Sequence, residues 1–182
     1  MSAPRSHEPR RTRWWIAAWG VLGFGAILVQ AIVGLAPLAW EPIAERSLSS
    51  VQIGLYIGWV GWMWYAEGYR AFQRQLCPRL VARALHLARN PVAHRVALAP
   101  LFCMGLFHAT RRRLVLAWAV LLGIVGLVIA VRQLSQPWRG LVDGGVVVGL
   151  GWGLGALLVT FGLAIAGREP TVSPELPHED HA

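Results

Sequence analysis

Charged residues are absent from four long stretches, and these stretches dominate the pattern of hydrophobic and polar positions along the chain. The stretches are Trp14 to Trp40, Ser47 to Ala66, Leu114 to Val131 and Gly144 to Gly167. Each is close to or longer than the roughly 20 residues that an α-helix needs to cross a bilayer. None alternates apolar and polar residues as the strands of a membrane barrel do. The pattern therefore predicts an all-α membrane protein with several spans.

Proline limits the first stretch, because Pro37 disfavours helical geometry at the residue before it. We expect the first helix to end near Leu35 or Ala36, which gives a span over residues 14–36. The other three spans are predicted over residues 48–66, 114–131 and 144–167. The remaining segments are a basic tail over 1–13, outer loops over 37–47 and 132–143, a central loop over 67–113 and a disordered acidic tail over 168–182.

Arginine is the basic residue of this chain, which has 17 arginines and no lysine. With four spans and both termini on one side, 14 arginines lie on that side and three on the other. Basic residues accumulate in cytoplasmic loops, so we expect both termini and the central loop in the cytoplasm. The same rule accounts for the net charge of +8, and we therefore expect no nucleic-acid partner. The exclusive use of arginine is typical of a GC-rich genome and favours a bacterial inner membrane.

Two alternatives change the number of spans. A fifth span could cover Val96 to Phe107, but this stretch has 12 residues and contains Pro100 and Gly105. It would also place Arg111 to Arg113 on the outer side, against the charge rule. A re-entrant or interfacial course over 92–109 stays open. A cleaved signal peptide is disfavoured, because the first apolar stretch exceeds the roughly 7–15 residues of a signal sequence.

Glycine is the strongest signal for contacts between the predicted helices. Small residues four positions apart let helix backbones approach closely in membranes. We expect such helix packing at Gly54, Gly58, Gly123, Gly145, Gly149 and Gly153. This spacing favours a tight bundle or a homo-oligomer, and a narrow permeation path lined by glycine is the alternative.

An amphipathic segment over about 79–89 lies in the central loop. Arg79, Arg83 and His86 share one side of a helical wheel, while apolar residues occupy the other side. Such a helix should lie in the membrane interface, with its guanidinium groups among the phosphates of anionic lipids. We expect headgroup contacts from Arg70, Arg74, Arg79, Arg83, His86 and Arg89.

Catalytic and cofactor motifs are missing from the sequence. The central loop carries several potential metal ligands, namely Glu67, Cys77, His86, His94, Cys103 and His108. No Cys-x-x-Cys or His-x-x-x-His pair anchors them, so we predict no metal and no cofactor. Glu67 is instead expected to form an ion pair with Arg70, three residues later on the same helix.

The predicted spans contain no Asp, Glu, Lys, Arg or His, which disfavours a proton-coupled carrier. We therefore interpret the chain as a non-catalytic scaffold or accessory subunit of a membrane complex, in contact with anionic lipid. Its expected partners are the bilayer and either a second copy or another subunit. Two other functions stay open: a homo-oligomeric channel or facilitator, and an enzyme that acts on a lipid or lipid-linked substrate at the cytoplasmic face.

Overall fold

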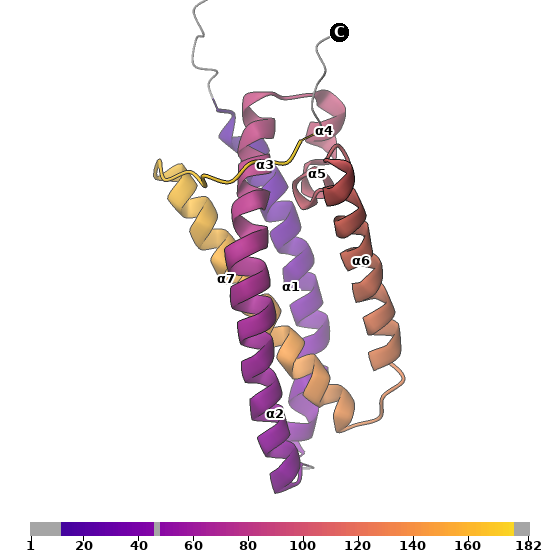
Figure 1. Cartoon of the computed structure of the whole chain (residues 1–182). Coiled ribbons are helices and arrows are strands. Elements are labelled where there is room, and N and C mark those ends of the chain that lie inside the picture. The colour runs from indigo at the N-terminus through magenta and orange to yellow at the C-terminus, as the bar shows by residue number, and fades with distance from the viewer. Residues whose placement is uncertain (1–11, 46–47, 177–182) are drawn as a thin grey trace, which may run out of the picture.

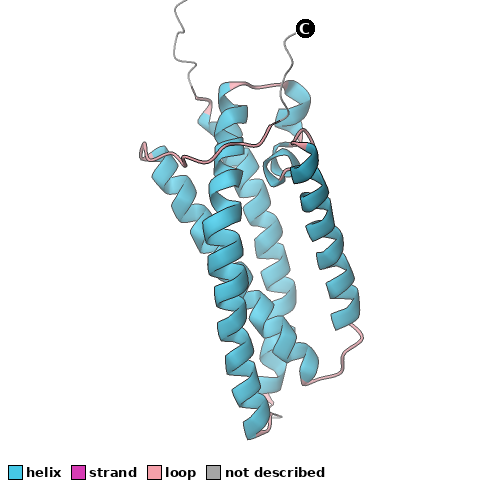
Figure 2. Cartoon of the chain, viewed as in Figure 1, coloured by secondary structure: helices cyan, strands magenta, loops and turns pink. Residues whose placement is uncertain are grey.

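The computed structural model describes residues 12–45 and 48–176, and every regular element within these ranges is a helix (Figures 1 and 2). In chain order the helices are α1 (Trp14–Ala44), α2 (Ser50–Met63), η1 (Trp64–Leu76), α3 (Cys77–Arg89), α4 (Ala93–Ala97), α5 (Ala99–Met104), α6 (Arg111–Val131) and α7 (Trp138–Ile165). Among the described helices, α1, α6 and α7 are long and apolar enough to cross a membrane. The all-helical fold is confirmed. The fourth span stays a prediction, and its residues are shared between α2 and η1.

One continuous rod is formed by α2, η1 and α3, which follow one another without a break (Figure 1). A capping box starts the rod: Ser49 Oγ accepts from the backbone N–H of Gln52 at 3.3 Å, and Gln52 Oε1 accepts from the backbone N–H of Ser49 at 2.9 Å. The rod ends at Asn90, whose backbone is no longer helical and which precedes Pro91. The segment predicted as a separate interfacial helix is therefore the last part of a longer helix.

The winding of the rod changes in its middle. Helix η1 is a π-helix of 13 residues, a form that is rare, usually limited to single turns and frequent at functional sites. Pro78, which has no N–H to donate, follows directly at the second residue of α3. Because the hydrogen-bond pattern already changes at this junction, the chain passes through Pro78 without ending the helix.

Helix α1 continues past Pro37 and Pro42 to its end, so the helix end expected before Pro37 is wrong. Pro42 leaves the carbonyl of Leu38 without a helical N–H partner. Nε2 of Gln136 donates to this carbonyl at 3.3 Å. Gly140 of α7 leaves the space that the Pro42 ring occupies. Contacts from a distant part of the chain thus stabilise a helical course that the local sequence disfavours.

The buried core lies at the end of the bundle where α3 packs against α1, α5 and α7. Helix α5 lies close to α1 because Gly20 and Gly23 leave room for Cys103 and Pro100. Burial raises the pKa of the Cys103 thiol to about 12, so this side chain is an uncharged core residue. Helices α4 and α5 have 5 and 6 residues, too few to cross a bilayer. The alternative fifth span therefore does not form.

Helix α6 stands apart from the rest of the bundle (Figure 1). Its most apolar stretch contains no buried residue, and Val131 at its end is the one buried residue along it. A helix that is apolar on all sides is unstable in water and is normally covered by lipid or by other protein. We therefore take the extent of α6 as the reference for membrane depth along the other helices.

Candidate functional site

Contacts at the two ends of α6 show which residues of the rod lie at the same height along the bundle. At its start, Arg113 Nε lies 3.6 Å from one carboxylate oxygen of Glu175, and the other oxygen lies 3.7 Å from Arg79 Nε in α3. At its end, Val131 lines an apolar pocket of about 380 Å³ together with Trp59 of α2. Helix η1 lies between these two levels. A bilayer that covered the whole of α6 would therefore also reach η1.

At this depth η1 exposes a polar ridge formed by Arg70, Gln73, Arg74 and Gln75. The Arg74 guanidinium carbon lies 5.8 Å from the centre of the Tyr69 ring. An arginine at the centre of a membrane helix costs about 2.5–3.5 kcal/mol on insertion scales, and such residues usually mark functional sites. The sequence pattern assigns these residues to a loop after the second span, whereas the structure places them in a helix, at the level of α6 along the bundle.

Another side of η1 packs against α7, and Gln73 at the edge of the ridge accepts a hydrogen bond from Trp152 Nε1 of α7 at 2.8 Å. Hydrogen bonds from i to i+5 bring residues five apart onto one face, so Glu67, Phe72 and Cys77 all face α7. A Cβ atom added to Gly149 would lie 2.9 Å from Glu67 Oε2, and one added to Gly153 would lie 2.6 Å from the Phe72 ring. Cys77 Sγ donates to the carbonyl of Gly153 at 3.7 Å. These two glycines therefore create the space that η1 fills.

Large side chains of α2 also lie over glycines of α7, nearer to the start of α7. Tyr56 lies over Gly144, and Trp59 lies over Gly145, each too close for an added Cβ. Trp59 Nε1 also donates to the carbonyl of Val142 at 3.2 Å. We call the set Gly144, Gly145, Gly149 and Gly153 the glycine track. Its function in this fold is to receive large side chains of the rod rather than a second glycine-rich backbone.

The other glycines predicted to pack helices lie in open surroundings. No described atom outside their own helical backbone lies within 4 Å of a Cβ added to Gly54, Gly58 or Gly123. These three positions are exposed on the surface of the described chain.

Glu67 forms no hydrogen bond or ion pair with another residue in the described part of the chain. Its Oε2 atom is buried and has no hydrogen-bond partner among the described residues. The predicted ion pair with Arg70 is not among the ion pairs of the described chain. The π-helical winding explains this outcome, because it turns Arg70 to the exposed ridge and Glu67 toward the glycine track.

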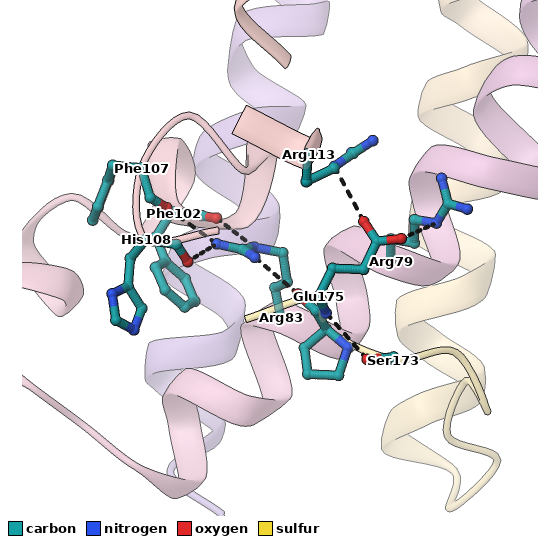
Figure 3. Close-up of polar contacts among 9 residues, drawn as sticks. Arg79, Arg83, Phe102, Phe107, His108, Arg113, Ser173 and Glu175 are labelled. Atoms are coloured by element: carbon teal, nitrogen blue, oxygen red, sulfur yellow. Dashed lines mark hydrogen bonds and ion pairs between the residues drawn. The ribbon is translucent and has the colours of Figure 1, made fainter. Parts of the chain in front are cut away.

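Arg83 lies in the core and not at the lipid surface. Its side chain is 2% exposed, and its guanidinium donates to the carbonyls of Phe102 (2.7 Å), Pro174 (2.8 Å), Phe107 (3.2 Å) and His108 (3.0 Å) (Figure 3). Burial lowers its pKa to about 10, which leaves the group charged at neutral pH. The predicted headgroup contact at Arg83 is therefore wrong, because carbonyl groups from distant segments enclose it.

The segment after α7 covers the charged side of α3 (Figure 3). Glu175 lies between Arg79 and Arg113, and Glu169 pairs with Arg89. The start of the predicted disordered tail is thus held by ion pairs. Residues 177–182 lie outside the described residues. Of the other predicted headgroup contacts, Arg70 and Arg74 are exposed on the ridge and His86 is half-buried.

The potential metal ligands of the central loop are not gathered by the fold. Among the described residues, no three His, Cys, Asp or Glu side chains form a group that could hold a metal ion. Cys77 and Cys103 are both free and buried.

Two buried charged residues, Asp143 and Arg83, escape prediction from the sequence, as does the burial of the Oε2 atom of Glu67. Asp143 is 4% exposed, and its Oδ2 lies 3.7 Å from Arg139 Nε on the same helix. Arg83 lies on the polar side of the helical wheel and is nevertheless enclosed. The sequence carries no spacing signal for Glu67. The side chains that meet Gly144, Gly145 and Gly149 are Tyr56, Trp59 and Glu67, and their intervals of 3 and 8 residues differ from the glycine intervals of 1 and 4.

Comparison with models of protein families, with curated proteins and with solved structures finds no match to this chain. The interpretation of the polar ridge and of Glu67 therefore depends on their geometry and chemistry.

Proposed function

We propose that this protein is a non-catalytic subunit of a bacterial inner-membrane complex and that it binds its partner through the polar ridge. One observation carries the proposal: Arg70 and Arg74 are exposed at the depth of the apolar helix α6. Lipid chains cannot accept hydrogen bonds from guanidinium groups, so burial in lipid alone is costly. A protein partner that supplies acceptors removes this cost.

The chemistry of the ridge favours a partner helix with an acidic or carbonyl-rich surface. A guanidinium group forms two parallel hydrogen bonds with a carboxylate, and glutamine amides bond across membrane helices. A twofold contact between ridges would bring arginines of two copies together, which costs energy. Glu67 and Asp143, the acids in η1 and α7, are turned inward and do not offset these charges. These features support a different polypeptide as the partner.

The distribution of arginines supports an orientation with both termini in the cytoplasm. In that orientation the core around α3 and the ion pairs of Glu175 lie at the cytoplasmic end of the bundle. The channel alternative is less favoured, because side chains of α2 and η1 fill the glycine track. In one copy, the glycine track therefore does not line an open path.

Purification from native membranes tests this proposal. Full-length protein with a C-terminal tag would be extracted in mild detergent and examined by native mass spectrometry. We expect a second polypeptide in stoichiometric amount. Replacing both Arg70 and Arg74 with Gln should reduce its recovery by at least about tenfold, which corresponds to a loss of about 1.4 kcal/mol.

Arg111 and Arg112 provide a matched control, since both are exposed arginines at the start of α6. Replacing these two with Gln removes the same charge and should leave the partner bound. A wild-type protein that purifies as a bare homo-oligomer would contradict the proposal. Equal recovery with both double variants would show that the ridge does not bind the partner.

A further inference from the structure

Glu67 differs from the ridge residues, because its carboxyl group is directed into the protein. The carboxyl carbon and Cβ of Glu67 each lie 3.3 Å from the position of a Cβ added to Gly149, and Oε2 lies at 2.9 Å. The whole side chain therefore lies over this glycine. Because Gly149 has no side chain, the Glu67 side chain fits against α7 at this position. No described residue donates a hydrogen bond to Oε2.

The elements packed around Glu67 offer no positive charge to balance a carboxylate. Helix α7 carries Arg139 and Asp143, which pair with each other near its start. Tyr56 is the titratable group of α2, and Cys77 is the first one along α3. Within η1, Arg70 and Arg74 lie on the polar ridge, and Tyr65 and Tyr69 stack on each other.

We propose that Glu67 is a proton-binding site at membrane depth, which holds its proton while the carboxyl group lies over Gly149. An unpaired carboxylate is very costly to bury, and such groups take up a proton instead. Loss of the proton would leave an uncompensated charge between η1 and α7. Proton release is therefore coupled to movement of the side chain away from the glycine track, toward water or the arginines of the ridge.

A hydrophobic carbodiimide provides a direct probe, because it reacts with protonated carboxyl groups in apolar surroundings. The carboxyl proton is transferred to a nitrogen of the carbodiimide, and the carboxylate oxygen adds to its central carbon. The O-acylisourea then rearranges to a stable N-acylurea. The reaction is an addition without a leaving group and without any change of oxidation state.

The experiment treats full-length protein in native membranes with dicyclohexylcarbodiimide at pH 7.5 and locates the adduct by peptide mass spectrometry. An ordinary glutamate is protonated in only about one molecule in a thousand at this pH. We expect labelling of Glu67 at least about tenfold above that of Glu169 and Glu175, and none at this position in Glu67→Gln. Labelling should decrease as the pH is raised. Labelling of Glu67 no greater than that of the two reference residues would overturn the proposal.

Two matched glycine variants test whether the space at Gly149 holds the neutral carboxyl. Gly149→Ala places a methyl group against Oε2 and should reduce the labelling of Glu67 several-fold. Gly151→Ala is the control, since no described atom outside its own helical backbone lies within 4 Å of the added Cβ. Equal labelling in the two variants, with both folded by thermal unfolding, would refute the assignment. Labelling of Glu67 by a water-soluble carbodiimide and a hydrophilic amine would also refute it.

This inference is independent of the proposed partner. The Arg70 and Arg74 variants should change recovery of a second polypeptide and leave the labelling of Glu67 in place. Failure of one proposal can therefore be distinguished from failure of the other.

Discussion

At the scale of single residues, Arg83 of α3 connects three regions of the chain that are distant in sequence. It donates to the end of α5, to the loop after α5 and to the segment after α7, and its guanidinium carbon lies 4.4 Å from the centre of the Phe102 ring. A helical wheel places Arg83 on a polar side and predicts exposure. Its acceptors lie 19 to 91 residues away along the chain, so a local pattern does not reveal them.

We predict that Arg83→Met destabilises the fold by about 2–4 kcal/mol, because it leaves several buried carbonyls without a donor. Thermal unfolding in detergent measures this as a lower Tm. Arg79→Met is the control: its ion pair at 3.7 Å is about one third exposed and should contribute at most about 1 kcal/mol. A Tm for Arg83→Met as high as that of Arg79→Met would contradict this role.

At the scale of elements, the charge-free stretches predict α1, α6 and α7 but not the length of the rod. The second charge-free stretch ends before Glu67, the first charged residue after it, whereas the continuous helix extends to Arg89. Two causes lie beyond local sequence: the π-helical winding of η1 and the complementarity between its side chains and the glycine track. The glycine spacing does predict a contact surface on α7, although its partner is a set of large side chains.

The glycine track leads to a prediction at this scale. Gly153→Ala would bring a methyl group within 2.6 Å of the Phe72 ring, and we expect a loss of about 1–3 kcal/mol from overpacking. Gly155→Ala faces open space on the same helix and should be neutral or stabilising by up to about 1 kcal/mol. Comparison of the two Tm values checks this difference. A reversed order would show that the track does not determine how η1 packs on α7.

At the scale of the whole molecule, the rod is longer than a bilayer is thick. Its 40 residues from Ser50 to Arg89 would extend roughly 60 Å as an α-helix, against about 30 Å of hydrocarbon. We infer from the position of α6 that the part of the rod in lipid includes η1. With this placement the polar ridge and Glu67 lie at membrane depth, and both proposals depend on it.

Thiol accessibility in native membrane vesicles tests this placement most directly. Ala71→Cys, in a background with Cys77 and Cys103 replaced by alanine, puts a small exposed probe beside the ridge. Val120→Cys on α6 is the membrane reference, and Val172→Cys after α7 is the aqueous reference. We predict that a membrane-impermeant maleimide, applied from either side, leaves Ala71→Cys as unreactive as Val120→Cys. Reaction as fast as that of Val172→Cys would place η1 in water and contradict the account.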